Sequence, residues 1–303
     1  MFYSGMSDIG RKRASNQDTF RITELDASDE QHRNHPLAVV CDGMGGMNGG
    51  NVASQTAVDS FNESFVKWYK ENKEETLSSA PVFADDDEEE MRPFRRSDKR
   101  SSNARRSQYR YQTVSENSIT PIGRALREAA SEANRAVMQR ASEDKSLEGM
   151  GTTLLAACFT GDIMHIANVG DCRLYLICGE DIRRVTHDHS YVQYLIDMGE
   201  LEPKDAENSP YRNIITRAVG REENLETDIF ALPMANFSGY ILMCSDGLYN
   251  FLSEKEIVMV VNAAVKGGDM SELDQKVQTL VRRANENGGG DNITAVLIRY
   301  SMD

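Results

Sequence analysis

The chain has 303 residues, of which 40% are hydrophobic and 27% charged, and its formal net charge is −14. This composition predicts a soluble globular protein of one large or two small domains, and the excess of acid argues against nucleic acid or an anionic membrane as a partner. No apolar stretch approaches the ~20 residues of a membrane span, and the N-terminal "MFYSGMSDIGRKR" lacks the apolar core of a signal peptide, so we expect a cytoplasmic protein.

The cysteines predict a reduced interior. No two of them form a CxxC pair, and most lie inside apolar runs, at Cys41, Cys158, Cys172, Cys178 and Cys244. This pattern is typical of buried thiols in a cytosolic protein and argues against a disulfide framework or a zinc site.

The first clear element is a short apolar strand at residues 37–41 (LAVVC), which stops at Asp42. Five glycines follow between Gly43 and Gly50. A helix is then predicted over residues 50–70, because apolar side chains recur there at steps of four, at Ala53, Ala57, Phe61 and Phe65.

Residues 71–118 have the composition of an insertion outside the core. Nine acidic residues and one basic residue occupy 71–90, and two acidic and eight basic residues occupy 91–118. So few apolar groups cannot offset the entropy cost of ordering the chain, so we expect a disordered, charged loop. It is either a solvated insertion without a role or a regulatory docking arm, since its serines lie among arginines.

The remainder contains one more long helix and a series of strands. The helix is predicted over residues 121–142, with Thr120 as its N-cap and Pro121 at its first position. Strands are predicted at residues 152–160, 163–170, 172–178, 240–247 and 293–300, with a hairpin turn at Gly161 and Asp162. Hairpin strands separated from the helices along the chain predict an α+β fold with antiparallel sheets.

Four aspartates share one position relative to these strands. Each lies where an apolar strand meets a glycine-containing turn, at Asp42, Asp171, Asp246 and Asp291. Carboxylates that converge at one sheet edge would repel each other unless a cation held them, and Mg²⁺ or Mn²⁺ prefers oxygen ligands. Any single Asp-Gly is more typical of an ordinary turn, but four such aspartates at strand ends together indicate a metal site.

The chain resembles the metal-dependent Ser/Thr protein phosphatases, the PPM or type 2C family, and within it the bacterial enzymes that are paired with kinases. The resemblance rests on eight stretches in family order, which cover nearly the whole chain except residues 71–118: SDIGRKRASNQDTF, VVCDGMGGMNGGNVAS, GMGTTLLAA, IANVGDCRLYLI, VTHDHSYVQYLIDMGELEP, NIITRAVG, ILMCSDGLYNFLS and GGGDNITAVLI. It implies a single catalytic domain over residues 1–303, built as a four-layer α-β-β-α sandwich with two central antiparallel sheets.

The resemblance also implies the site residues. Two Mn²⁺ or Mg²⁺ ions would be bridged by Asp42, with the Gly43 carbonyl on one ion and Asp246 and Asp291 on the other. By the same resemblance, Asp171 would be a tentative ligand of a third metal. Asp18 would be the acid that orients metal-bound water, and Arg13 would bind the substrate phosphate.

Three positions depart from the family pattern. Met44 and Met47 stand where relatives carry a histidine, which has been proposed as a general acid in animal members, so protonation of the leaving group falls to water. Cys172 replaces the usual serine of the GDSR block, and we expect an inert buried thiol there. We expect structural roles for His187 and His189, because a hard-oxygen metal site does not call for imidazole.

The function implied is hydrolysis of phosphoserine and phosphothreonine in proteins, in opposition to a cognate Ser/Thr kinase, by a monomer. One alternative keeps this fold but acts on anti-anti-sigma regulators; no sensory domain is present to support it. The other is a pseudophosphatase that acts as a binding protein, which the missing histidine favours and the complete aspartate set opposes.

Overall fold

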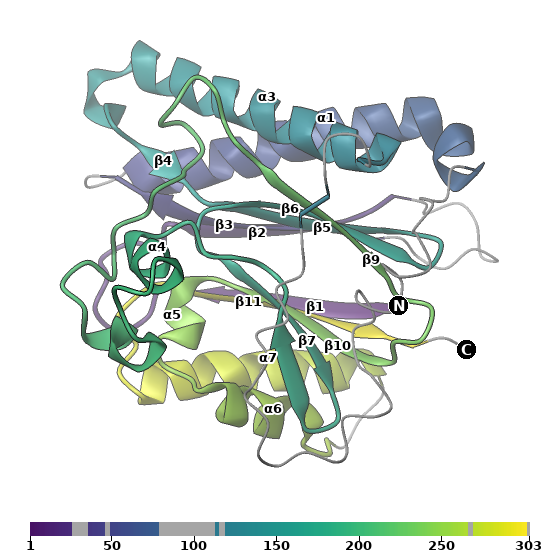
Figure 1. The fold of residues 1–303 in the computed structure, drawn as a ribbon, viewed down its shortest axis with the longest axis vertical. Coiled ribbons are helices and arrows are strands. Elements are labelled where there is room, and N and C mark those ends of the chain that lie inside the picture. Colours follow the sequence, from purple (N-terminus) through teal and green to yellow (C-terminus); the bar gives the residue numbers. More distant parts are fainter. Residues whose placement is uncertain (26–35, 46–48, 79–112, 115–118, 266–268, 302–303) are drawn as a thin grey trace.

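The computed structural model describes residues 1–25, 36–45, 49–78, 113–114, 119–265 and 269–301. Two antiparallel sheets lie face to face, with helices over both outer faces (Figure 1). This arrangement confirms the expected four-layer sandwich.

The first sheet has the strand order β1-β11-β10-β7-β8. Its strands are β1 (Phe2–Asp8), β11 (Ile293–Tyr300), β10 (Gly239–Cys244), β7 (Arg173–Cys178) and β8 (Asp181–Arg184). The first and last strands of the chain are therefore neighbours, and Phe2 lies opposite Arg299 in their register.

The second sheet has the order β2-β3-β5-β6-β9, with β4 paired to the end of β3. Its strands are β2 (Asp18–Glu24), β3 (Pro36–Met44), β4 (Gly151–Thr152), β5 (Leu154–Thr160), β6 (Ile163–Val169) and β9 (Asp228–Pro233). The predicted hairpin turn joins β5 to β6, where Gly161 has the positive φ of +53° that favours glycine.

Two long helices, α1 (Gly49–Ser78) and α3 (Pro121–Glu143), cover the second sheet. The predicted cap of α3 is confirmed, because the Thr120 side chain accepts a hydrogen bond from Gly123 N at 3.0 Å. Helix α1 continues to Ser78, past the expected start of the loop at residue 71, with a kink at Asn72. The sequence ENKEE there consists mainly of good helix formers, which explains the extension. The rest of the expected insertion, apart from residues 113 and 114, lies outside the described residues.

The first sheet is covered by α6 (Glu254–Asn262) and α7 (Asp269–Glu286), neither of which was predicted. The apolar face of α7 is nevertheless legible in the sequence, at Leu273, Val277, Leu280, Val281 and Ala284, all of them buried. Shorter elements lie at one end of the sandwich: α4 (Tyr191–Asp197), α5 (Asp246–Tyr249) and the 3₁₀ turns η2 (Lys145–Leu147) and η3 (Pro203–Asn208).

Three apolar layers hold the sandwich together. One lies between α1, α3 and the second sheet, one between the two sheets, and one between the first sheet and α6 and α7. All five cysteines are free thiols, as predicted, and only Cys178 is not fully buried. No described helix is both long and apolar enough to cross a bilayer.

Candidate active site

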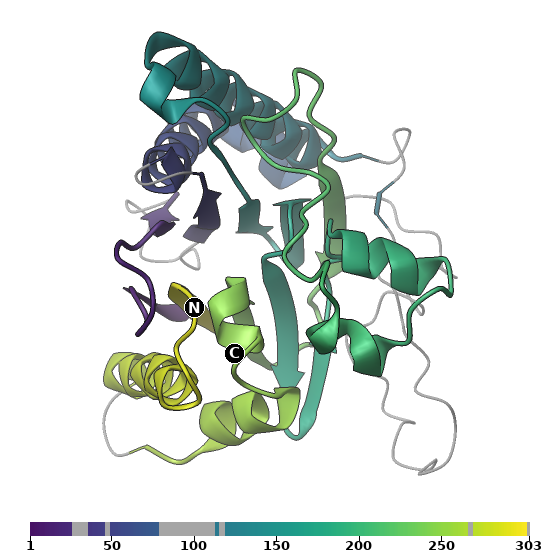
Figure 2. The same ribbon diagram turned by 90° about the vertical axis from the view of Figure 1, so that its left-hand side faces the viewer.

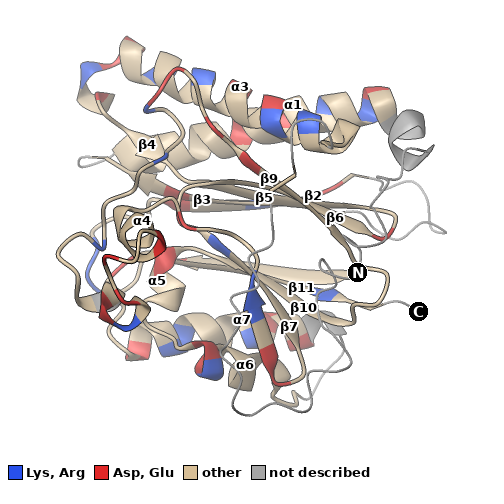
Figure 3. Cartoon of the chain, viewed as in Figure 1, with Lys and Arg blue, Asp and Glu red and all other residues tan. Residues whose placement is uncertain are grey.

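The aspartates singled out in the sequence meet at one end of the sandwich. Asp18 and Asp42 lie opposite each other in the register of β2 and β3. Asp171 follows β6, Asp246 begins α5, and Asp291 precedes β11. Acidic segments of both sheets accordingly appear together beside β3 and α5 in Figure 3. The carboxyl of Asp42 feels the charges of all four others, and burial together with these charges holds its pKa well above its usual range.

Hydrogen bonds from Thr152 and Thr153, just before β5, hold the backbone of Asp42 at the end of β3. Its amide N donates to Thr153 Oγ1 at 2.8 Å, and its carbonyl accepts from Thr152 Oγ1 and Thr153 N, each at 2.9 Å. Both threonines are fully buried. The sequence predicted a strand that begins at these residues and did not reveal that they hold Asp42. The two adjacent threonines after Gly151 were the signal in the sequence for this role.

The glycines after Asp42 permit close approach of three backbone segments. A Cβ at Gly43 would lie 2.1 Å from Gly50 O and 2.6 Å from Gln17 O. A Cβ at Gly50 would lie 2.7 Å from the Gly43 carbonyl oxygen. Side chains at these positions would therefore fill the space around that carbonyl, which explains the bare backbone in the sequence.

Asp18 links the two sheets. Its Oδ2 accepts hydrogen bonds from Ser245 Oγ and Thr294 Oγ1, both at 2.7 Å and both from the first sheet side of the site. Its Oδ1 is buried and has no hydrogen-bond partner in the described structure. Burial raises the pKa of this carboxyl to about 6.

Burial also raises the pKa of Asp246 and of Asp171. Asp246 Oδ1 is also buried without a partner among the described residues, and burial and the charges of Asp171 and Asp291 hold the pKa of Asp246 well above its usual range. Burial, with a smaller contribution from Asp188, raises the pKa of Asp171 to about 7. Clustered acids with two orphaned carboxylate oxygens are the donor set that a hard divalent cation requires, so the residues present fit Mg²⁺ or Mn²⁺.

Arg13 lies against Asp291. Its Nε and Nη2 donate to the two carboxylate oxygens at 2.7 and 2.6 Å, which raises the arginine pKa further. The structure thus joins the predicted phosphate-binding residue to a predicted metal ligand. Within the described ranges, no group of three or more acidic, histidine or cysteine side chains is arranged closely enough to hold a metal ion, and both carboxylate oxygens of Asp291 accept from Arg13.

Asn292 fixes the loop that carries Arg13. Its Nδ2 donates to the carbonyls of Ile9 and Ser15 at 2.9 and 3.0 Å, and its Oδ1 accepts from Gln17 N at 2.9 Å. This positioning role is not apparent from the sequence, because the three contacts join Asn292 to the opposite end of the chain.

The two histidines and Cys172 that the sequence analysis singled out have structural contacts. His189 accepts from Gly170 N through Nδ1 at 3.0 Å and contacts Asp228 through Nε2, and His187 pairs with Asp197, in line with structural roles. Cys172 Sγ lies 3.1 Å from Thr153 Oγ1, and burial holds its pKa well above the usual range, which agrees with an inert thiol. Met44 ends β3, while Met47 lies outside the described residues.

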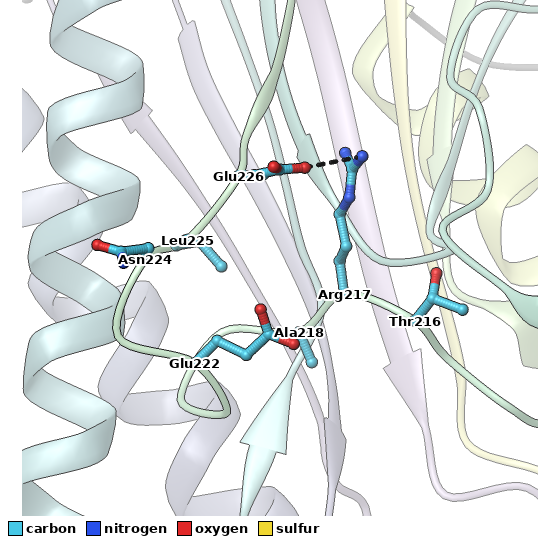
Figure 4. A pocket seen from close by; sticks show the side chains of 7 residues that line it. All are labelled: Thr216, Arg217, Ala218, Glu222, Asn224, Leu225 and Glu226. Carbon is cyan, nitrogen blue, oxygen red and sulfur yellow. Dashed lines mark ion pairs between the residues drawn. The ribbon is translucent and has the colours of Figure 1, made fainter.

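A cavity of about 240 Å³ lies elsewhere, between the segment after α4 and the turn before β9. Figure 4 shows its seven lining residues, among which Arg217 pairs with Glu226 at 3.0 Å. Arg217 also pairs with Asp228 at 3.0 Å. None of the clustered aspartates lines this cavity, and its one arginine is neutralised by two acids, so it is not the centre described above.

Comparison with known proteins identifies the fold and the relatives. The family model "Protein phosphatase 2C" matches residues 9–297. The serine/threonine phosphatase stp of Listeria monocytogenes is 32% identical, over 98% of this chain and 94% of its own. Crystal structures of similar fold include the phosphatase Stp1 from Staphylococcus aureus (TM-score 0.71, 27% identity, 99% and 95% covered). Another is the catalytic domain of the phosphatase PstP in complex with two manganese ions (TM-score 0.66, 24% identity, 97% and 96% covered).

Proposed function

The chain belongs to the protein phosphatase 2C family, and from that premise we propose that it hydrolyses phosphoserine and phosphothreonine in proteins, with two divalent cations, in opposition to a Ser/Thr kinase. The observation that carries the proposal is the cluster of five aspartates at the edge of the sandwich, of which Asp18 and Asp171 are buried. Two carboxylate oxygens of the cluster are buried without a hydrogen-bond partner among the described residues. Such a cluster is costly unless a cation neutralises it.

The residues that would hold the metals are Asp42, the Gly43 carbonyl, Asp246 and Asp291, and Asp171 would be a ligand for a third ion. When bound, divalent cations at this place supply a water that is acidic enough to attack phosphorus near neutral pH. The orphaned Asp18 Oδ1 accepts a hydrogen bond from the attacking water, while its Oδ2 stays fixed by Ser245 and Thr294.

Arg13 binds the phosphate. Its guanidinium already makes a two-pronged contact with the Asp291 carboxylate, and the same fork matches two phosphate oxygens. In the hydrolysis, water would lose a proton to solvent and form one P–O bond, and the bond to the Ser or Thr oxygen would break, with that oxygen taking a proton from solvent. Neither Met44 nor Met47 has an acidic proton to give, and we expect the absence of a general acid to lower the rate by a factor of about 10²–10⁴.

The test is release of phosphate from a phosphothreonine peptide with Mn²⁺ or with EDTA, for the wild type and for Asp42→Asn. We expect release only from the wild type with Mn²⁺. A second readout, independent of turnover, is the melting temperature, which Mn²⁺ should raise in the wild type more than in Asp42→Asn.

Full activity in EDTA, or in Asp42→Asn, would contradict the two-metal proposal. Folded wild-type protein that releases no phosphate with any divalent ion would favour the binding-protein alternative instead.

A further inference from the structure

A groove of about 450 Å³ lies between β1, the loop after it and the outer face of α7. Apolar side chains line part of it, namely Met6, Ile9 and Val281, and Ile9 is 40% exposed. Arg11 and Arg282 line it from opposite sides, one on the loop and one on α7. In Figure 2 the purple loop and the yellow helix that form it lie on the same side of the molecule.

The loop that lines the groove lies beside the candidate active site. A Cβ on Gly10, which lines the groove, would lie 2.1 Å from the Asp291 carbonyl oxygen. Arg11 N donates to Gly289 O at 2.8 Å, which fixes the same loop beside Asp291. Arg13 stands two residues further along the same loop, at most about 7 Å of chain from Arg11, so Arg11 lies within reach of the residues that flank a phosphate bound to Arg13.

The lip of the groove is positively charged although the whole chain carries −14. Arg11, which lines the groove, and the next residue, Lys12, are both exposed, and neither makes an ion pair within the described part of the chain. The acid in the groove is already engaged, because Asp8 Oδ1 accepts from Gly10 N at 2.8 Å and from Asn285 Nδ2 at 2.9 Å. Arg282 pairs with the exposed Glu286, so a ligand gains most from the two unpaired cations on the loop.

We infer that this groove binds the polypeptide of the phosphoprotein substrate beside its phosphorylated residue, with acidic side chains against Arg11 and Lys12 and an apolar side chain against Ile9. The inference rests on the proposed phosphatase function and adds the class of substrate: phosphoproteins with acidic flanks.

The test uses the full chain with Mn²⁺ and matched phosphothreonine peptides. The peptides differ only in two flanking residues, Asp-Asp, Ala-Ala or Lys-Lys, placed before the phosphothreonine in one set and after it in another. We expect the wild type to have a kcat/KM for the Asp-Asp peptide about three- to tenfold above that for Lys-Lys in one of the sets, the effect of two exposed ion pairs. The preference should shrink at high salt.

The variant Arg11→Glu/Lys12→Glu should reverse this order, a gain of specificity that a misfolded protein cannot show. Its control is Lys67→Glu/Lys70→Glu, which makes the same change of charge at two exposed lysines of α1, about 27 Å along that helix from its start beside the site. Hydrolysis of p-nitrophenyl phosphate, which has no flanks, is measured for each of the three proteins and serves to normalise its peptide rates.

The outcomes separate the two proposals. A wild type that hydrolyses p-nitrophenyl phosphate but shows no flank preference in either peptide set contradicts the proposed peptide groove and leaves the phosphatase function standing. An Arg11→Glu/Lys12→Glu variant that keeps the wild-type order of preference has the same meaning. A wild type that hydrolyses neither the small ester nor any peptide overturns the phosphatase function and the groove with it.

Discussion

The side chains of Thr152 and Thr153 support Asp42 by hydrogen bonding to its backbone. Thr153 shows this best, because its hydroxyl accepts the Asp42 amide proton and lies against the Cys172 sulfur in a fully buried setting. The sequence motif identified Asp42 but not this support, since hydrogen bonds between residues 111 positions apart become apparent only when β3 and β5 are paired.

Replacement of Thr153 by Val should test this support, because Val keeps the branched shape and removes the hydroxyl. A buried Asp42 amide without a partner costs about 1–3 kcal/mol, so we expect a loss of that size in the free energy of unfolding by urea in EDTA, together with slower phosphate release. Thr153→Ser retains the hydroxyl and should lose much less on both measures. Equal losses in Val and Ser variants would show that the methyl packing, not the hydrogen bond, matters.

At the scale of elements, the loop between β1 and β2 shows where prediction from the sequence stops. Strands and helices with a strong period, such as α3 and the β5–β6 hairpin, were predictable because burial imposes the period. The loop at residues 9–17 has no period, and its conformation depends on Asn292 from the far end of the chain. Only the tertiary structure reveals that contact, and with it the pairing of Arg13 with Asp291.

Loss of the Asn292 side chain should release this loop. Three hydrogen bonds disappear in Asn292→Ala, each worth about 0.5–1.5 kcal/mol, so the loop should open at least tenfold more often. Trypsin cuts after Arg and Lys, and the rate of cleavage at Arg11, Lys12 and Arg13, followed by mass spectrometry, should rise accordingly. The exposed Asn287, which donates to Phe251 O at 2.8 Å, provides the control Asn287→Ala, which should leave this rate unchanged.

At the scale of the whole molecule, the acidic residues that the proposed function needs lower the stability of the metal-free fold as the pH rises. Burial raises the pKa of Asp18 to about 6 and of Asp171 to about 7, above the value of about 3.9 expected in the unfolded chain. The folded protein therefore binds more protons than the unfolded one between about pH 4 and pH 7, and its stability falls as the pH rises through that window.

We therefore expect metal-free protein to be more stable at pH 5.5 than at pH 7.5, and Mn²⁺ to remove most of this difference. Asp246→Asn should flatten the pH dependence and raise the metal-free melting temperature, because it removes one charge from the cluster, while phosphate release is lost. The measurement is thermal unfolding in EDTA and in Mn²⁺ at both pH values. A metal-free wild type that is less stable at pH 5.5 than at pH 7.5 would contradict the assignment of a strained acidic cluster.

The position of β11 has a consequence for synthesis of the protein. This strand comes last in the chain, yet it lies between β1, which comes first, and β10. A ribosome therefore makes the second sheet, with Asp18 and Asp42, long before the strand that completes the first sheet. Because the pairing of β1 with β11 joins residues from opposite ends of the described chain and such non-local contacts form slowly, the sandwich and its site can close only after β11 has been made.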